Sequence, residues 1–266
     1  MPDLAWWQWT LGGLCAFFVG VAKTGVPGLG VFVVPLMVFA AANARQSAGW
    51  LLPLLCVADV FAVVYYRRHA VVRRLLALVP WVVVGMVAGA AALGGSEKVL
   101  RPVVGAIVLA MVGLRLWSGR RPSETPAAAG DALQGPSAGG PSVGAPVGKR
   151  AGAAFGVVAG FATTVANAAG PVMNLYLLAQ RFPKAEFIAT GAWFFLVINL
   201  AKVPIYVGHG LIDGRSLLFD AVVLPALLIG VRTGRALFFC LPQRLFEAIV
   251  VGLTVVAALA LLVPWR

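Results

Sequence analysis

Charged side chains are scarce in this sequence. Only 11% of its 266 residues are Asp, Glu, Lys or Arg, and 61% are hydrophobic. Soluble globular domains carry about 25% charged residues, so the composition excludes an ordinary soluble domain. Apolar runs of about 20 residues recur along the chain, which is the length that crosses the core of a bilayer. We therefore predict an all-α polytopic membrane protein.

Residue types that carry catalysis or bind metals are also sparse. The chain has two histidines, and its three cysteines, Cys15, Cys56 and Cys240, stand isolated in apolar sequence. This spacing fits neither a metal site nor a disulfide framework, and no cluster of Cys, His and Met suits a transition-metal permease. The seven serines lie in loops or at the ends of spans, and no HExxH motif occurs. We expect no enzyme activity, no cofactor and no metal site.

Bulky apolar residues are few in one segment, residues 119–150, with the sequence GRRPSETPAAAGDALQGPSAGGPSVGAPVGKR. Such a composition cannot bury enough surface to fold, so we predict a flexible linker. The linker divides the chain into a first membrane repeat, residues 1–118, and a second membrane repeat, residues 151–266.

The two halves repeat each other weakly, and the matches keep their order along the chain. At an offset of 140 residues, small residues match in pairs, and so do a tyrosine and a histidine: Gly20 with Gly160, Ala22 with Ala162, Thr24 with Thr164, Gly30 with Gly170, Tyr66 with Tyr206 and His69 with His209. At an offset of 145 residues the pairs are Pro80 with Pro225, Gly85 with Gly230 and Gly89 with Gly234. We interpret these matches as a duplication.

Each half begins with a long interrupted apolar segment, which three ordinary spans follow. The interrupted segments are residues 9–42 and 152–180, and the spans are residues 48–66, 78–95, 99–118, 188–208, 217–239 and 245–263. An interrupted segment is too long for one upright helix across about 30 Å and short for two full spans with a loop. One long tilted helix, or two shorter helices that meet at a glycine-rich break, would fit.

The distribution of basic residues separates these two topologies. If each interrupted segment returns to the side where it starts, thirteen basic residues lie on one face and five on the other. If it crosses once, the counts are eleven and seven. The first topology fits the positive-inside rule better. It predicts two inverted repeats, each a broken-helix hairpin plus three transmembrane helices, with the linker in the cytoplasm; this is a transporter architecture. Because the net charge of +12 lies in short loops, we expect a lipid bilayer and no nucleic acid as partner.

The two breaks are the predicted binding site. A helix can break inside a bilayer where the free backbone groups line a cavity, and the N-terminus of the following helix attracts anions. The predicted substrate-binding residues come from GVAKTGVPGLG, from TTVANAAGPVMN and from one later lysine: Lys23, Thr24, Gly25, Gly28, Gly30, Thr163, Thr164, Asn167, Gly170, Asn174 and Lys202. Alternatives stay open, because such glycines also suit close helix packing, such threonines bond to their own helix and a lysine near a span end reaches the interface.

Two further polar residues are candidates for coupling. Asp59 is the most central carboxylate in its span, and Asn199 occupies the same position at the offset of 140 residues. An intramembrane charge is costly and is usually functional. Asp59 could carry a coupling proton or could pair with Lys23, and the sequence leaves both open.

The segment GVAKTGVPGLGVFVVPLM and its counterpart GFATTVANAAGPVMNLYLL resemble the signature of the sulfite exporter TauE/SafE family of membrane permeases. The two halves, the length and the PxxxxGxxxG element of each half also resemble that family. The resemblance covers the chain except the linker. It implies export of sulfite, sulfoacetate or a related organosulfonate across a bacterial plasma membrane. We expect alternating access coupled to the proton gradient; an anion channel, or a permease for another small solute or metal ion, is the alternative.

Deletion of residues 124–145 is expected to leave expression and anion flux largely intact. The composition of this segment cannot support a core, and a shorter flexible tether still spans two adjacent halves. Membrane expression and flux into liposomes measure the effect. Loss of flux at normal expression would instead mean that the segment binds a partner or gates the pathway.

Overall fold

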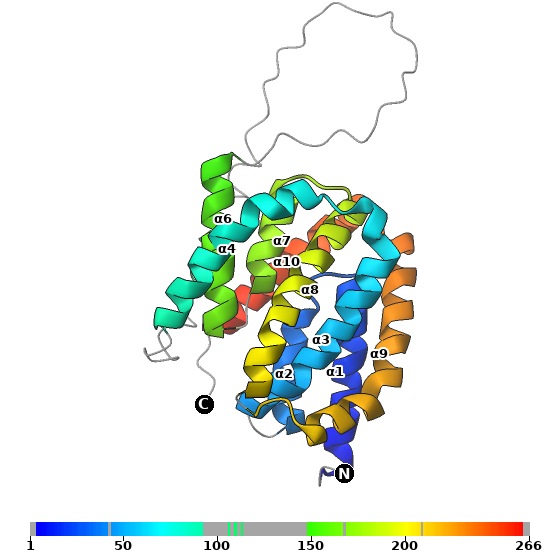
Figure 1. Ribbon diagram of the computed structural model, residues 1–266. Coiled ribbons are helices and arrows are strands. Elements are labelled where there is room, and N and C mark those ends of the chain that lie inside the picture. Colours follow the sequence, from blue (N-terminus) through cyan, green and yellow to red (C-terminus); the bar gives the residue numbers. More distant parts are fainter. Residues whose placement is uncertain are drawn as a thin grey trace, which may run out of the picture.

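The computed structural model describes residues 4–41, 44–92, 106, 109–110, 113, 148–166, 169–208 and 210–262. Within these ranges the secondary structure is helical and contains no strand (Figure 1). Most of the predicted span 99–118 and nearly all of the predicted linker 119–150 lie outside the described residues.

The helices follow the predicted order. The first half contains α1 (Trp6–Thr24), α2 (Gly30–Ala41), α3 (Ala44–Tyr66), the short 3₁₀ helix η1 (Arg67–His69) and α4 (Val72–Ala92). The second half contains α6 (Lys149–Ala166), α7 (Ala169–Ala179), α8 (Lys184–Gly208), α9 (Gly214–Cys240) and α10 (Gln243–Leu262).

Four helices in the described part of the chain are long and apolar enough to cross a membrane. Their candidate spans are Gln46–His69, Val72–Gly89, Lys184–Gly208 and Gly214–Cys240. Large apolar side chains such as Val64, Val87 and Ile229 are exposed on these helices, as expected of surfaces that face lipid. The chain is an all-α polytopic membrane protein.

One predicted boundary is wrong. The span predicted over residues 78–95 begins earlier in the structure, since α4 starts at Val72 and includes Arg73 and Arg74. Arginine is a good helix former, and its long side chain lets the head group stay in water while the backbone begins the membrane helix.

Each interrupted segment is two short helices rather than one tilted helix. α1 ends at Thr24 and α2 begins at Gly30, and the two helices pack against each other. Gly28 in the turn has a φ of +111°, a backbone conformation that only glycine adopts readily. In Figure 1, α2 returns toward the end of the bundle where the N-terminus lies, and α3 starts there.

The second interrupted segment breaks between α6 and α7. α7 begins at Ala169, so Pro171 is the third residue of the helix. It still lies in the first turn, where a missing N–H removes no intrahelical hydrogen bond.

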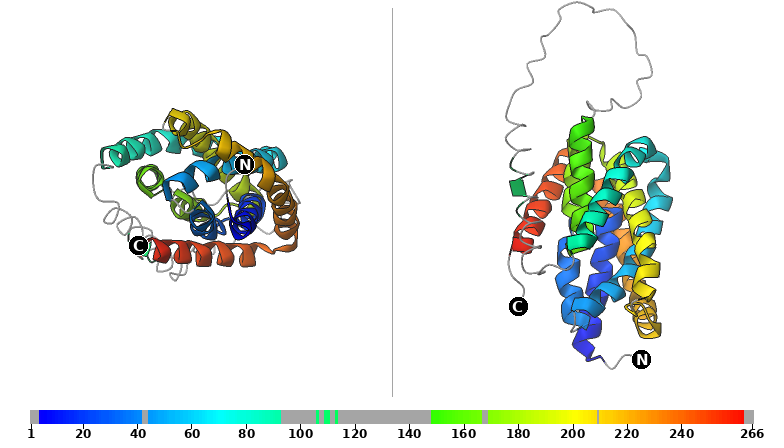
Figure 2. Two further views of the ribbon diagram at one scale, coloured as in Figure 1. Left: turned by 90° about the horizontal axis from the view of Figure 1, so that it is seen from below. Right: turned by 60° about the vertical axis from the view of Figure 1, so that its left-hand side comes forward.

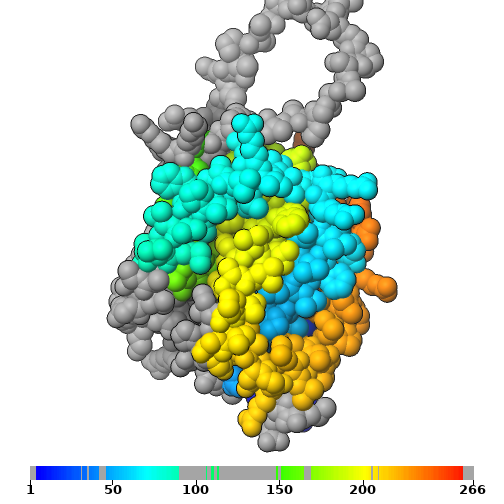
Figure 3. Space-filling view, in the orientation of Figure 1, coloured from blue at the N-terminus to red at the C-terminus, as the bar shows by residue number. Residues whose placement is uncertain are grey.

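Corresponding helices of the two halves run in opposite directions. In Figure 1, α1 and α3 run upward from the N-terminal end, whereas α6 and α8 run downward. α10 lies along one side of the bundle, against α7 and α2 (Figure 2). α3 and α8 lie side by side near the middle of the molecule, in blue and yellow in Figure 3.

Basic loops gather at the upper end of the bundle in Figure 1. The Lys184 Nζ atom donates hydrogen bonds of 2.6 Å to the carbonyl oxygens of Phe238 and Leu241. The backbone N–H of Val71, between η1 and α4, donates to the Thr190 hydroxyl oxygen over 3.0 Å. These bonds bring the loops after α3, α7 and α9 to the same end.

The two halves pack through glycines. Gly20 of α1 and Gly25, which caps the C-terminus of α1, lie against Gly230 and Gly234 of α9. A Cβ atom at Gly25 would collide with the Gly234 backbone. The matched glycines do the same elsewhere, since Gly85 and Gly89 of α4 and Gly156 and Gly160 of α6 line the α4–α6 contact. Small residues let helix backbones approach closely in a membrane. Close packing is therefore the observed role of Gly25.

Replacing Gly25 by alanine is expected to lower the free energy of unfolding by about 1–3 kcal/mol, because the added methyl group overpacks the contact with Gly234. Gly13→Ala is the matched control on the same helix, since a Cβ atom there meets nothing within 4 Å. Thermal unfolding of the purified protein in detergent measures both variants. Equal stability of the two variants would contradict the close α1–α9 packing.

Candidate functional site

The centre of the site is an ion pair between α1 and α3. The Lys23 Nζ atom lies 2.8 Å from Asp59 Oδ1, and the exposed fractions of the two side chains are 15% and 0%. The ammonium also lies 4.1 Å from the centre of the Phe195 ring of α8, a distance at which a cation is attracted to the ring face. Of the two roles that the sequence left open for Asp59, the pair with Lys23 is observed.

Asp59 also joins the two halves. Its Oδ2 atom accepts a hydrogen bond of 2.8 Å from the Asn199 side-chain amide on α8. The two residues occupy the same position at the offset of 140 residues. One carboxylate is therefore shared between a lysine of its own half and an amide of the other half.

A second polar pair lies one helical turn further along α8. The Lys202 Nζ atom donates a hydrogen bond of 2.8 Å to the Thr163 hydroxyl oxygen of α6, and both residues are buried. Lys202 therefore points into the protein, although a lysine near a span end could also have reached the interface. Asn199 and Lys202 are three residues apart and share one face of α8.

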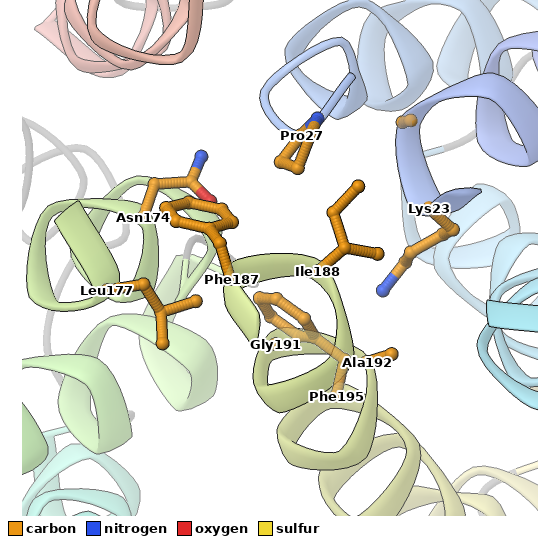
Figure 4. A pocket seen from close by; sticks show the side chains of 10 residues that line it. Lys23, Pro27, Asn174, Leu177, Phe187, Ile188, Gly191, Ala192 and Phe195 are labelled. Atoms are coloured by element: carbon orange, nitrogen blue, oxygen red, sulfur yellow. The ribbon is translucent and has the colours of Figure 1, made fainter. Parts of the chain in front are cut away.

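A cavity of about 40 Å³ opens beside Lys23 (Figure 4). A water molecule needs roughly 10–15 Å³ on this measure, so the space suits a few waters or one small anion. Two of the predicted substrate residues, Lys23 and Asn174, line it from opposite sides, and the rest of the wall is apolar: Ala22, Pro27, Leu177, Phe187, Ile188, Gly191, Ala192 and Phe195.

Other predicted residues have contacts of a structural kind. The Thr24 hydroxyl lies 2.9 Å from the carbonyl oxygens of both Gly20 and Val231, and the Thr24 carbonyl oxygen accepts from Tyr66. The Thr164 hydroxyl donates to the Gly160 carbonyl oxygen of its own helix over 3.0 Å.

The remaining predicted residues lie near the breaks without lining the cavity. Gly28 forms the turn between α1 and α2. A Cβ atom at Gly30 or Gly170 would meet nothing within 4 Å. Asn167 lies outside the described residues.

The aromatic side of the cavity, Phe187 and Phe195 of α8, was not identified from the sequence. A periodic pattern in the sequence of α8 nevertheless marks part of it. Phe195, Asn199 and Lys202 follow one another at intervals of four and three residues, which places them on one face of a helix. Ile188 and Gly191 or Ala192 continue the same face toward the start of α8. A periodic stripe through the two polar residues would have identified this wall.

Comparison with known proteins gives one finding. Residues 12–261 match the family model described as Sulfite exporter TauE/SafE. No curated protein and no solved structure matches the chain.

Replacing Asp59 by asparagine is expected to destabilise the protein by about 3–5 kcal/mol, because the buried Lys23 ammonium loses its counter-charge. The double variant Lys23→Gln/Asp59→Asn removes both charges and is expected to regain most of this loss. Thermal unfolding of the purified variants measures the effect. If the double variant is as unstable as Asp59→Asn, the loss comes from packing and not from the unpaired ammonium.

Proposed function

The chain belongs to the sulfite exporter TauE/SafE family of membrane transporters, and from this premise we propose that it exports sulfite, sulfoacetate or a related organosulfonate. One observation carries the proposal. The Lys23 ammonium, which is the charged group in the wall, lies beside a small cavity at the break between α1 and α2.

The wall of the cavity suits a small anion with an apolar part. An anion in this space meets the Lys23 ammonium on one side and the Asn174 amide on the other, and apolar walls strengthen such contacts because little water screens them. Phe187 and Phe195 offer aromatic surface to a methylene group or to the faces of a small ligand.

Asp59 is the proposed coupling residue, with Asn199 as its partner. In the structure Asp59 neutralises Lys23, so a substrate anion competes with the carboxylate for the same ammonium. Asn199 still donates to the carboxylate when Lys23 turns to the substrate. Protonation of Asp59 would release Lys23, and this is how we propose that anion binding is coupled to the proton gradient. Lys202 and Thr163 form the second polar pair next to this switch.

The proposed architecture consists of two inverted repeats, residues 1–118 and 151–266, joined by a cytoplasmic linker over residues 119–150. The opposite directions of α1 and α6, and of α3 and α8, support it. The basic end of the bundle is then the cytoplasmic face, and alternating access exposes the site to each side in turn. We propose a bacterial plasma membrane as the location.

Flux into liposomes tests the proposal with a panel of sulfite, sulfoacetate, sulfate, taurine and a divalent metal ion. We expect transport of sulfite or sulfoacetate by the wild type. Lys23→Gln keeps the length and polarity of the side chain but removes its charge, and is expected to weaken apparent affinity by about 1–3 kcal/mol, or roughly 5- to 150-fold.

Arg73→Gln is the control, because it removes a charge from an exposed position at the basic end. Unchanged affinity and rate in folded Lys23→Gln would place the anion site elsewhere. Transport of the metal ion alone would favour the permease alternative, and unitary currents would favour a channel.

A further inference from the structure

One buried carboxyl group has no place in the site described above. Asp220 lies on α9 with an exposed fraction of 8%. Neither of its carboxyl oxygens has a hydrogen-bond partner among the described residues. Asp213, at the start of the same helix, is satisfied, because its carboxylate accepts a bond of 2.8 Å from the Ser216 backbone N–H.

The surroundings of Asp220 are apolar. The neighbouring Phe219 is fully buried, and the centre of its ring lies 5.3 Å from that of Trp9 on α1 and 4.6 Å from that of Trp50 on α3. α1 and α3 both pack against α9. Asp220 is therefore buried next to a layer formed by two tryptophans and a phenylalanine.

The titratable and charged groups that the structure describes near this layer do not neutralise a carboxylate. On α1 the near group is the Cys15 thiol, which donates to the Val33 carbonyl oxygen over 3.4 Å. Lys23 follows Cys15 by eight residues, about 12 Å along the helix. On α3 the carboxylate of Asp59 follows Trp50 by nine residues, about 13 Å. On α9 itself, Arg215 is exposed.

An ionised carboxylate without a partner is strongly disfavoured in such a place, so the group keeps its proton in the observed packing. Packing does not require an acid there. At the offset of 145 residues that matches the glycines of α4 and α9, the position of Asp220 corresponds to Leu75, which is buried. A buried carboxyl group at this position is less stable than the leucine at the matched position of the other half. This cost in folding free energy indicates that the carboxyl group has a function.

We propose that Asp220 is a proton-binding site that makes export depend on the pH of the outer side. Asp220 follows the first residue of α9 by six residues, about 9 Å, at the end of the bundle opposite the basic loops. The neutral acid keeps α3 closed on the pair of helices α1 and α9. When its O–H bond breaks, the proton passes to water of the outer side. The remaining carboxylate then needs water around it, which opens that end of the packing.

This inference rests on the proposed function for its flux readout, and a spectroscopic readout is independent of transport. Infrared difference spectra of the protein in nanodiscs are compared between wild type, Asp220→Asn and Asp59→Asn. We expect a band of a protonated carboxyl group at neutral pH that Asp220→Asn removes. Asp59→Asn should leave it, because Asp59 is ion-paired. Absence of that band, or its survival in Asp220→Asn, would overturn the proposal whether or not any anion is transported.

Flux from liposomes at varied outer pH then tests the coupling. Export by the wild type and by Asp220→Glu is expected to rise as the outer pH rises. Asp220→Asn mimics the neutral acid and is expected to lose this dependence on outer pH. Asp220→Leu tests whether the packing accepts leucine, which is the residue at the matched position 75. If Asp220→Asn keeps the wild-type dependence on outer pH, Asp220 is a structural acid and the proposal fails. If the wild type exports none of the tested anions, the proposed function fails while the infrared result still decides the state of Asp220.

Discussion

The structure depends on the buried Asp59 carboxylate and on the two groups that bind it, one from each half of the chain. Lys23 supplies the counter-charge from α1 and Asn199 supplies an amide from α8. Removing either charge alone would leave the other unpaired in a medium that solvates it poorly. This constraint fixes the relative positions of α1, α3 and α8, and it holds the ammonium at the wall of the cavity. Fold and site therefore share the same three side chains.

The membrane class, the broken helices and the position of Lys23 beside a break could be predicted from sequence because each leaves a local signal. Apolar runs have the length of a span, and glycines with a proline mark the turn between α1 and α2. The partners of Asp59 could be inferred only in part. Asp59 and Asn199 were matched as equivalent positions, but their contact depends on how two halves meet in space. Asp220 could not be singled out from the sequence, because its lack of partners is a property of the packing.

The glycine contacts explain why two weakly similar halves form one bundle. α1 of the first half packs on α9 of the second, and α6 of the second half packs on α4 of the first. The same matched glycines line both contacts. Each half therefore contributes a helix to the other, in addition to the contacts among its own helices. Three matched glycine pairs are therefore found where helix backbones touch: Gly20 with Gly160, Gly85 with Gly230 and Gly89 with Gly234. The polar residues around Asp59 differ between the halves.

The close contact of α1 with α9 has a consequence for movement. With backbone against backbone at Gly25 and Gly234, no side chains lie between the helices there that could slide or change rotamer. In the proposed alternating access, α1 and α9 therefore move together, and the same holds for α4 and α6. The boundary between moving parts then does not coincide with the boundary between the halves of the sequence. Each of the two helix pairs, α1 with α9 and α4 with α6, combines one helix from each half. Lys23 and Asp220 belong to the same pair, α1 with α9.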